Sequence, residues 1–228
     1  MRTDELIRAL AADSARPVIP IERWLTGALL AGITLSAGLF LAALHARPDI
    51  AAAVYTPAFC FKVVVTLSLG ATGAFLLSDA ARPTPRIRWR GALLLAPVLL
   101  MAGVIFELVT VPAHSWSTKL IGHNAAHCLS LIPLLAIAPA ACLLVALRRG
   151  APARPALAGA MAGLVAGAVG ATLYALTCPD DSALFVATWY SIAIIAVTGA
   201  SAYGGQRERL KTALTIAERA CRRTPRPP

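Results

Sequence analysis

The chain has 228 residues, of which 58% are hydrophobic and only 14% are charged, and its mean hydropathy is +0.71. A soluble domain carries about a quarter charged residues, so this composition argues against one. The net charge of +10 would suit nucleic-acid binding, but the basic residues lie between long apolar stretches, where they would meet anionic lipid headgroups. Five cysteines are too few and too scattered for a disulfide scaffold. The pattern is typical of a polytopic membrane protein.

Six apolar stretches are each long enough to cross a bilayer, whose core of about 30 Å needs roughly 20 apolar residues in a helix. The first 23 residues are polar, and we expect no cleavable signal peptide. We therefore predict an all-α bundle of six transmembrane helices. The expected spans are Trp24–Leu44, Ala58–Leu77, Gly91–Val111, His127–Leu147, Ala156–Leu176 and Ala183–Tyr203.

The positive charges are distributed unevenly over the loops. Of the 21 lysines and arginines, 18 lie in the two terminal segments, the second loop and the fourth loop, whereas the remaining loops hold only Arg47 and Lys119. By the positive-inside rule, both termini are predicted to be cytoplasmic. The predicted organisation is a cytoplasmic N-terminal segment (1–23), a six-helix transmembrane domain (24–203) and a basic cytoplasmic tail (204–228).

Small residues recur every four positions in the fifth span, at Gly159, Gly163, Gly167 and Ala171. Residues spaced in this way share one face of a helix, and small side chains let another helix approach closely. This face is predicted to be a seam between helices.

Histidines and cysteines gather in or beside the loops predicted to face outward. His123 and His127 are one helical turn apart, and Cys128 adjoins the second of them. Imidazole and thiolate are ligands that select zinc or copper. The candidate ligands for such a transition-metal ion are His114, His123, His127 and Cys60, with His45 also nearby. The alternatives are that these side chains simply pack among helix ends, or that Cys128 and Cys178 form a disulfide.

Two charged residues, Lys62 and Glu107, lie inside predicted spans, about one turn from the outer boundary. A charge at membrane depth is costly unless it is paired or hydrated, so we predict an ion pair between them. The alternative is a proton or ion path in a small transporter. Asp180 and Asp181 follow Pro179 and are expected to form a solvated turn rather than a metal site.

The opening segment, MRTDELIRALAAD, has the features of a short amphipathic helix, with Thr3 as N-cap and acidic residues in its first turn. An isolated helix of about ten residues is marginal in water. It would gain stability by docking into a partner's groove or by lying on the membrane surface. In the tail, Leu210, Leu214 and Cys221 share a face among basic residues, which favours association with anionic lipid.

Several segments together resemble the NrsF family of bacterial inner-membrane anti-sigma factors, negative regulators of an extracytoplasmic-function (ECF) sigma factor. The resemblance covers residues 1–205 and is carried by the opening segment, by ARPD (46–49), by FKVVVTL (61–67), by HCLSLIPLLAIAP (127–139) and by ALRRGAPARPALAGAMAGLVAGAVGATLYALTCPDDSALFVATWY (146–190). It implies a six-span protein whose cytoplasmic parts sequester the sigma factor. It further implies release under metal or oxidative stress through two periplasmic-side cysteines, which correspond to Cys128 and Cys178. The residues then expected to contact the sigma factor are Thr3, Asp4, Leu6, Ile7, Leu10 and Asp13.

The predicted function is therefore that of a membrane-bound anti-sigma factor with a cysteine sensor, which binds a sigma factor and lipid but no nucleic acid. We expect no enzymatic activity, because the chain has no paired carboxylates, nucleophile motif or phosphate-binding loop. The alternative is a small metal-ion or proton-coupled transporter. Pro97, Pro133 and Pro139 could break helices as in transporters, but they do not recur at matched positions in two halves.

Overall fold

The structure is a computed structural model that describes residue 5 and residues 20–82, 87–150 and 152–223, with the side chains of 87–90 and 208–223 left undescribed. The predicted sigma-contacting residues Thr3, Asp4, Leu6, Ile7, Leu10 and Asp13 lie outside the described residues.

The described chain is helical and contains no strand, which confirms the predicted all-α class. Six helices are long and apolar enough to cross a membrane, and their bounds fall within a few residues of those predicted. The long helices are α2 (Ile21–Ala43), α4 (Pro57–Ala80), α5 (Leu95–Thr110, preceded by the 3-10 helix η1, Ile87–Leu94), α7 (Ala125–Leu147), α8 (Pro155–Ala175) and α10 (Ser191–Arg223). The short elements are α3 (Ile50–Ala53), η2 (Ala113–Ser115), α6 (Trp116–Ile121), α9 (Ala183–Phe185) and the π-helical turn η3 (Val186–Tyr190).

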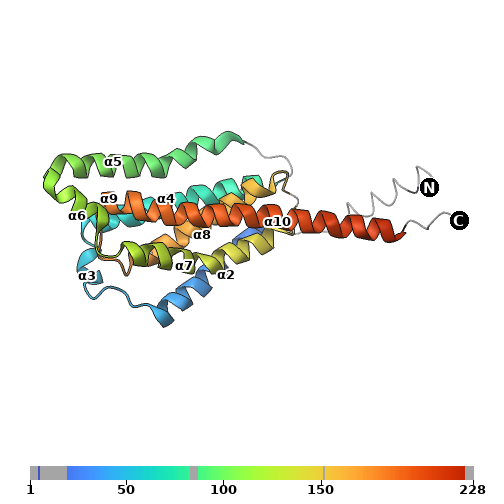
Figure 1. The fold of residues 1–228 in the computed structure, drawn as a ribbon, viewed down its shortest axis with the longest axis horizontal. Helices are drawn as coiled ribbons and strands as arrows, with labels where there is room; N and C mark the ends of the chain where they lie inside the picture. The colour runs from blue at the N-terminus through green and yellow to red at the C-terminus, as the bar shows by residue number, and fades with distance from the viewer. Residues whose placement is uncertain (1–4, 6–19, 83–86, 151, 224–228) are drawn as a thin grey trace.

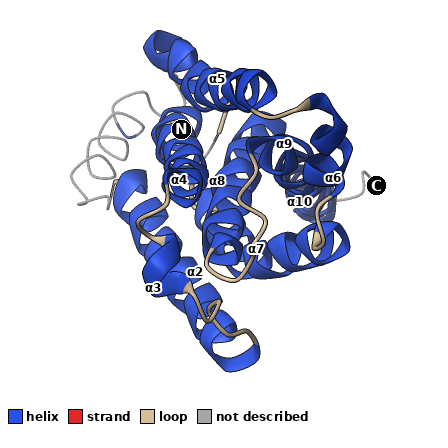
Figure 2. Ribbon diagram, turned by 90° about the vertical axis from the view of Figure 1, so that its left-hand side faces the viewer, coloured by secondary structure: helices blue, strands red, loops and turns tan. Residues whose placement is uncertain are grey.

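Helix α8 lies at the centre of the bundle, packed against α4, α7 and α10 (Figure 2). Its glycine face forms the predicted seam. A Cβ built on Gly159 would lie 2.5 Å from the Ser201 backbone oxygen, and one on Gly163 would lie 2.7 Å from the Ser201 Cβ. Residues larger than glycine would force α10 away from α8. The small-residue spacing therefore sets how closely the two helices approach.

Helices α2 and α7 are joined by a polar contact at a proline. Helix α7 continues through Pro139, but a proline has no N–H to donate to the carbonyl four residues earlier, which belongs to Leu135. The hydroxyl of Ser36 on α2 donates a hydrogen bond to that carbonyl oxygen at 2.6 Å. Gly32, one turn earlier on α2, lies against Pro139. The serine thus satisfies the acceptor that the proline leaves open, and α7 does not break there.

Helix α5 runs along the edge of the bundle (Figure 1). Its large apolar side chains, among them Met101, Ile105 and Val109, are exposed, whereas Ala96 and Glu107 are buried. An apolar helix with so little buried surface needs another apolar environment around it, and a bilayer supplies one.

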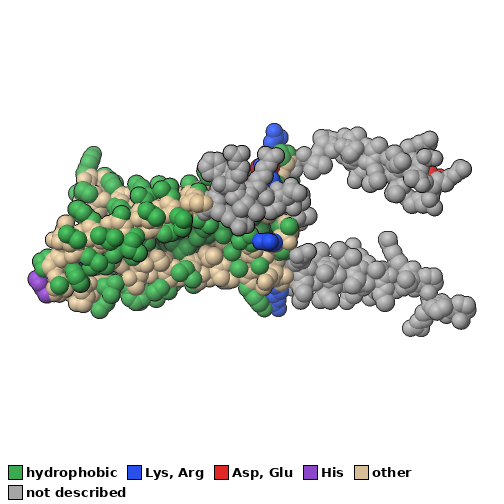
Figure 3. All heavy atoms as spheres, turned by 90° about the horizontal axis from the view of Figure 1, so that it is seen from above, with side chains coloured by type: hydrophobic (Ala, Val, Ile, Leu, Met, Phe, Trp, Pro, Cys, Tyr) green, Lys and Arg blue, Asp and Glu red, His purple; other side chains and the backbone are tan. Residues whose placement is uncertain are grey.

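The two ends of the bundle differ in charge. At one end Arg82 pairs with Glu22 at 2.8 Å, and the Arg149 guanidinium lies 3.9 Å from the ring centroid of Trp24. The histidines lie at the opposite end, as the purple and blue atoms of Figure 3 show. Below, these are called the arginine end and the histidine end. Helix α10 passes out of the bundle at the arginine end and continues unbroken to Arg223 (Figure 1).

Candidate functional site

Cys128 and Cys178 lie in one buried cluster near the histidine end. Cys128 occupies the first turn of α7 and is 0% exposed, and Cys178 follows α8 and is 1% exposed. Both belong to the same hydrophobic core, and both are free thiols. The structure thus brings together the two cysteines singled out from the sequence, although 50 positions separate them.

Aromatic side chains enclose the two thiols. Tyr174, Phe185 and Tyr190 are members of the same core cluster. The ring centroid of Tyr190 lies 5.9 Å from that of Tyr174 and 6.3 Å from that of Phe185. The hydroxyl of Tyr190 is buried and has no hydrogen-bond partner among the described residues. We call these three aromatic residues with Cys128 and Cys178 the thiol core.

Burial controls the chemistry of the thiol that follows α8. It raises the pKa of Cys178 above its ordinary value, and the nearby Lys62 ammonium offsets only part of that effect. The reactive form of cysteine is the thiolate, both as a nucleophile and as a metal ligand. At neutral pH this residue is therefore a protonated, shielded thiol in the conformation described.

The Lys62 ammonium lies directly beside the thiol core and is fully buried. Its Nζ donates a hydrogen bond to the Cys178 carbonyl oxygen at 2.9 Å and pairs with Asp181 Oδ1 at 2.5 Å. Asp181 also binds Arg47 at 2.8 Å, and Arg47 in turn pairs with Asp49 at 2.6 Å. These ion pairs hold the segment after α8 against α4 and against the loop that follows α2.

The predicted ion pair between Lys62 and Glu107 is wrong. Glu107 pairs instead with Lys119 at 3.0 Å, and its second oxygen accepts hydrogen bonds from Ser182 Oγ at 2.9 Å and the Leu184 N–H at 3.1 Å. Sequence reasoning paired the two charges that lie inside spans, but each finds its partner in a loop or a short helix. Because both charges are satisfied locally, neither supports an ion path.

The expectation that Asp180 and Asp181 form a solvated turn is also wrong. Their side chains are only 15% and 16% exposed. Asp180 Oδ2 accepts hydrogen bonds from the backbone N–H groups of His123 and Asn124, at 3.1 and 3.0 Å, and from the Asn124 side chain at 3.1 Å. The chain can present both N–H groups because Gly122 before them has a φ of +58°, which glycine tolerates.

Residues 176–185 thus contact the loop after α2, helices α4 and α5, and the loop before α7. We call this stretch the clamp segment, and its polar partners are His45, Arg47, Lys62, Glu107, His123 and Asn124. The polar contacts lie immediately after Cys178 in the chain and continue into α9. Any movement of the clamp segment therefore disturbs the thiol core.

The proposed metal ligands are not gathered into one site. His114, His123, His127 and Cys60 are all exposed, and the Cys60 thiol donates to the Val54 carbonyl oxygen at 3.2 Å. The described residues contain no group of three or more histidine, cysteine or carboxylate side chains placed to hold a metal ion. His123 Nδ1 lies 3.8 Å from Asp180 Oδ1.

Comparison with known proteins shows where the chain belongs. The family model described as "Negative regulator of sigma F", NrsF, matches residues 10–208. The chain is 39% identical over 203 residues to the anti-sigma-F factor NrsF of Caulobacter vibrioides, covering 86% of this chain and 94% of that protein. It is 35% identical over 200 residues to a probable anti-sigma-F factor NrsF of Azospira oryzae, covering 86% and 92%. The chain belongs to the NrsF family. No solved structure matches it.

The region that matches the NrsF model contains the thiol core and the clamp segment. Sequence reasoning missed Arg47, Asp181, Ser182 and Asn124 as members of this arrangement. A signal was present, because Arg47 is one of two basic residues in loops otherwise free of positive charge, and a buried Lys62 requires a carboxylate partner. The partner could not be identified, because spacing along the chain does not show which loop folds over which helix.

Proposed function

We propose that this chain is an anti-sigma factor that retains an ECF sigma factor at the bacterial inner membrane and releases it when the thiol core is disturbed. The observation that carries the proposal is that residues 10–208 of the chain match the NrsF family. Both relatives compared above are named as anti-sigma-F factors, one of them as probable. The arrangement of the bundle supports the proposal at both of its ends.

The arginine end is the proposed cytoplasmic side. Basic residues at the cytoplasmic ends of transmembrane helices are the strongest determinant of orientation, and Arg82, Arg148 and Arg149 lie at that end. Helix α2 begins there, so the preceding residues 1–19 would face the cytoplasm together with the continuation of α10. The sigma factor would bind on this side, with residues 3–13 as the primary contact.

The thiol core is the proposed point of signal input, and it lies at the opposite, periplasmic end. A soft metal ion would displace the protons of the Cys128 and Cys178 thiols and bind their sulfurs. Alternatively, a periplasmic oxidant would take two electrons from the thiols, two protons would leave, and a disulfide would form. Either event would change the distance between the start of α7 and the end of α8.

Access to the thiols requires an opening, since both are buried. Buried cysteines are ordinarily inert, so a sensor of this type must first expose them. The clamp segment is the element whose displacement would do so, because it carries Cys178 and is held by ion pairs that include Lys62 and Asp181. Competition for those ion pairs, or transient opening, would admit the metal ion or oxidant.

Transmission to the arginine end would follow the long helices. Helices α7 and α8 begin or end at the thiol core and run the length of the bundle, and α10 starts beside Tyr190 and leaves at the opposite end. Packed helices move as rigid elements, and a shift of one against another is a common switching motion. The switch would thus bias the surface that holds the sigma factor.

Sigma-factor binding is tested by co-purification from membranes. The full chain and a variant lacking residues 1–16 are each expressed with the ECF sigma factor encoded nearest to this gene. We expect the full chain to retain the sigma factor and the deletion to lose it. The matched control is deletion of residues 212–228, which leaves the N-terminal segment intact. Retention by the N-terminal deletion at the level of the full chain would contradict the assigned contact, and no retention by either would contradict the function.

The sensor role is tested separately, with a reporter gene driven by that sigma factor. Cys128→Ser and Cys178→Ser should each abolish induction by cadmium, chromate or peroxide, whereas Cys60→Ser and Cys142→Ser should leave it unchanged. The uninduced reporter should remain low in all four variants, which shows that each still binds the sigma factor. Normal induction in the double Cys128→Ser, Cys178→Ser variant would remove the sensor role and leave the anti-sigma role standing.

A further inference from the structure

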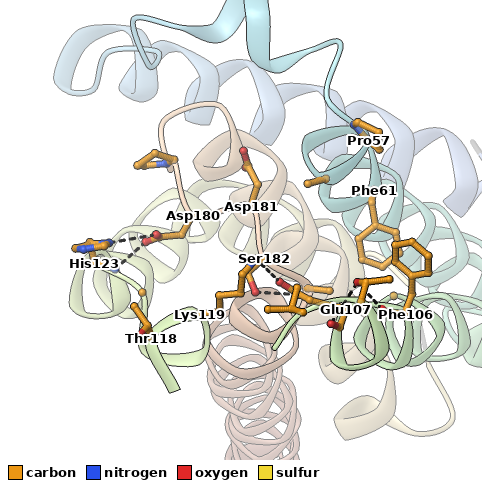
Figure 4. A pocket seen from close by; sticks show the side chains of 17 residues that line it. Pro57, Phe61, Phe106, Glu107, Thr118, Lys119, His123, Asp180, Asp181 and Ser182 are labelled. Carbon is orange, nitrogen blue, oxygen red and sulfur yellow. Dashed lines mark hydrogen bonds and ion pairs between the residues drawn. The ribbon is translucent and has the colours of Figure 1, made fainter. Parts of the chain in front are cut away.

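A cavity of about 840 Å³ opens between α4, α5, α6 and the clamp segment (Figure 4). Its volume lies in the range of about 300 to 1,000 Å³ that is usual for small-molecule sites. One wall is apolar and is formed by Pro57, Ala58 and Phe61 of α4 and by Phe106 of α5. The cavity is distinct from the thiol core, since neither Cys128 nor Cys178 lines it.

Phe61 lies directly against α5, and both form part of the cavity wall. A Cβ built on Gly103 would lie 2.2 Å from the Phe61 ring, so the aromatic side chain rests on the bare backbone of α5. The Phe106 side chain beside it is 71% exposed. The apolar wall therefore continues onto the outer surface of α5, which lipid chains would cover.

The other end of the cavity is polar and lies against the clamp segment. Glu107, Lys119, Asp180, Asp181 and Ser182 line it. The ion pairs of these residues extend to Arg47, Lys62 and Asp49, which do not line the cavity. The whole group then has three cations, Arg47, Lys62 and Lys119, and four carboxylates, Asp49, Glu107, Asp180 and Asp181. These seven groups sum to one uncompensated negative charge at the polar end.

That charge is located at Asp180. Glu107 and Asp181 each have a cation within 3.0 Å, whereas Asp180 Oδ1 lies 3.8 Å from His123 Nδ1, beyond hydrogen-bonding distance. Among the described residues this oxygen accepts no hydrogen bond, while Oδ2 of the same carboxylate accepts three. Asp180 lines the polar end of the cavity, with its carboxylate turned toward His123, whereas Phe61 and Phe106 line the apolar end (Figure 4).

We propose that this cavity binds an amphiphile with a cationic ammonium head and an apolar body. The head would lie at Asp180 Oδ1, and the body would lie along Ala58, Phe61 and Phe106. A carboxylate or phosphate monoester head would face the uncompensated negative charge and is disfavoured. An aminophospholipid of the membrane and a free amphiphilic amine share this chemistry. The proposal concerns binding and does not depend on the proposed anti-sigma function.

The first test measures binding to the purified full chain in an uncharged maltoside detergent by native mass spectrometry. The probes are dodecylammonium, dodecanol and dodecanoate, which share one chain length and differ in head charge. We expect the ammonium probe to saturate at one equivalent, at least about tenfold more tightly than the other two, because an ionic contact in a partly buried site exceeds a neutral one. Equal binding of dodecanol, or binding without saturation at one equivalent, would overturn the proposal.

Variants assign the binding to this cavity. Ala58→Trp fills the apolar wall and should abolish binding, whereas Val64→Trp, on the exposed face of the same helix and outside the lining, should not. Asp180→Asn keeps an oxygen for the N–H donors and removes the charge, so it should weaken ammonium binding about tenfold and leave dodecanol binding unchanged. Should Asp180→Asn fail to fold, the two tryptophan variants alone show whether the ammonium probe binds in this cavity. Unchanged ammonium binding by Ala58→Trp contradicts the site.

The source of the ligand is found by analysing the protein as extracted from membranes. An aminophospholipid retained by the wild-type chain and by Val64→Trp, but absent from Ala58→Trp, identifies a lipid ligand. An empty wild-type chain that still binds the ammonium probe identifies a free amphiphile.

Discussion

The Lys62 ammonium donates a hydrogen bond to the carbonyl oxygen of Cys178 at 2.9 Å while its charge is neutralised by Asp181. One buried side chain therefore connects α4 to Cys178, a member of the thiol core. Removing one partner of a buried ion pair leaves the other charge uncompensated, which is costly. The thiols of this protein are thus shielded by an electrostatic contact as well as by apolar packing.

Replacing Lys62 should expose the thiols. Lys62→Met leaves the Cys178 carbonyl without its donor and Asp181 with Arg47 alone, at a cost of about 3–5 kcal/mol. In a background with Cys60, Cys142 and Cys221 changed to serine, maleimide labelling of Cys128 and Cys178 in membranes should accelerate at least about tenfold. Lys119→Met serves as control because Lys119 is 40% exposed and pairs with Glu107. Equal labelling rates in the two variants would contradict the shielding role.

Stability should depend on alkaline pH through Cys178. Burial raises the pKa of this thiol above its ordinary value near 9.0, so the folded chain keeps a proton that the unfolded chain loses. The contribution to stability is fully present below about pH 9 and declines as pH rises further. Cys178→Ser should show a smaller fall in the thermal midpoint between pH 8 and 10 than wild type. Cys142→Ser on α7 should follow wild type, and a Cys178→Ser profile parallel to it would refute the assignment.

The six spans could be predicted because their information is local. Length and hydropathy defined each helix, and the bounds of the span that begins at Gly91 came within one residue of the structure. The four-residue spacing around Gly163 likewise predicted a close helix contact, although its partner α10 was not named. These features follow from the thickness of the bilayer and the periodicity of the helix, which are the same for every membrane-spanning helix.

The polar contacts at the histidine end could not be predicted in the same way. Lys62 and Glu107 were recognised as charges that need partners, but pairing them with each other assumed that α4 and α5 place them face to face. The clamp segment instead folds between them, so that Asp181 reaches one and Ser182 reaches the other. Loop conformation decides such pairings, and hydropathy carries no information about it.

Two glycine substitutions, one in the seam between α8 and α10 and one on α2, should have opposite effects on stability. In Gly163→Ala the new Cβ would lie 2.7 Å from the Ser201 Cβ and 2.8 Å from the Thr198 Cα, so the helices must separate, at about 1–3 kcal/mol. Gly27→Ala on α2 meets nothing within 4 Å and should stabilise its helix by up to about 1 kcal/mol. Thermal unfolding of the two variants in one detergent measures both effects. Destabilisation of equal size would show that the seam is not close-packed.

The joint between α2 and α7 gives a test in which one substitution should cancel the effect of another. Ser36→Ala removes the donor to the Leu135 carbonyl and leaves a buried acceptor unsatisfied, at about 1–3 kcal/mol. Pro139→Ala restores the N–H that an unbroken helix would offer to the same carbonyl. In the Pro139→Ala background, Ser36→Ala should therefore cost less than about half of its effect in the wild-type chain. The measurement is a double-mutant cycle of unfolding free energies, with Ser130→Ala on the exposed face of α7 as the control. Additive effects of the two substitutions would mean that Ser36 stabilises the joint through packing rather than by satisfying the carbonyl that Pro139 leaves free.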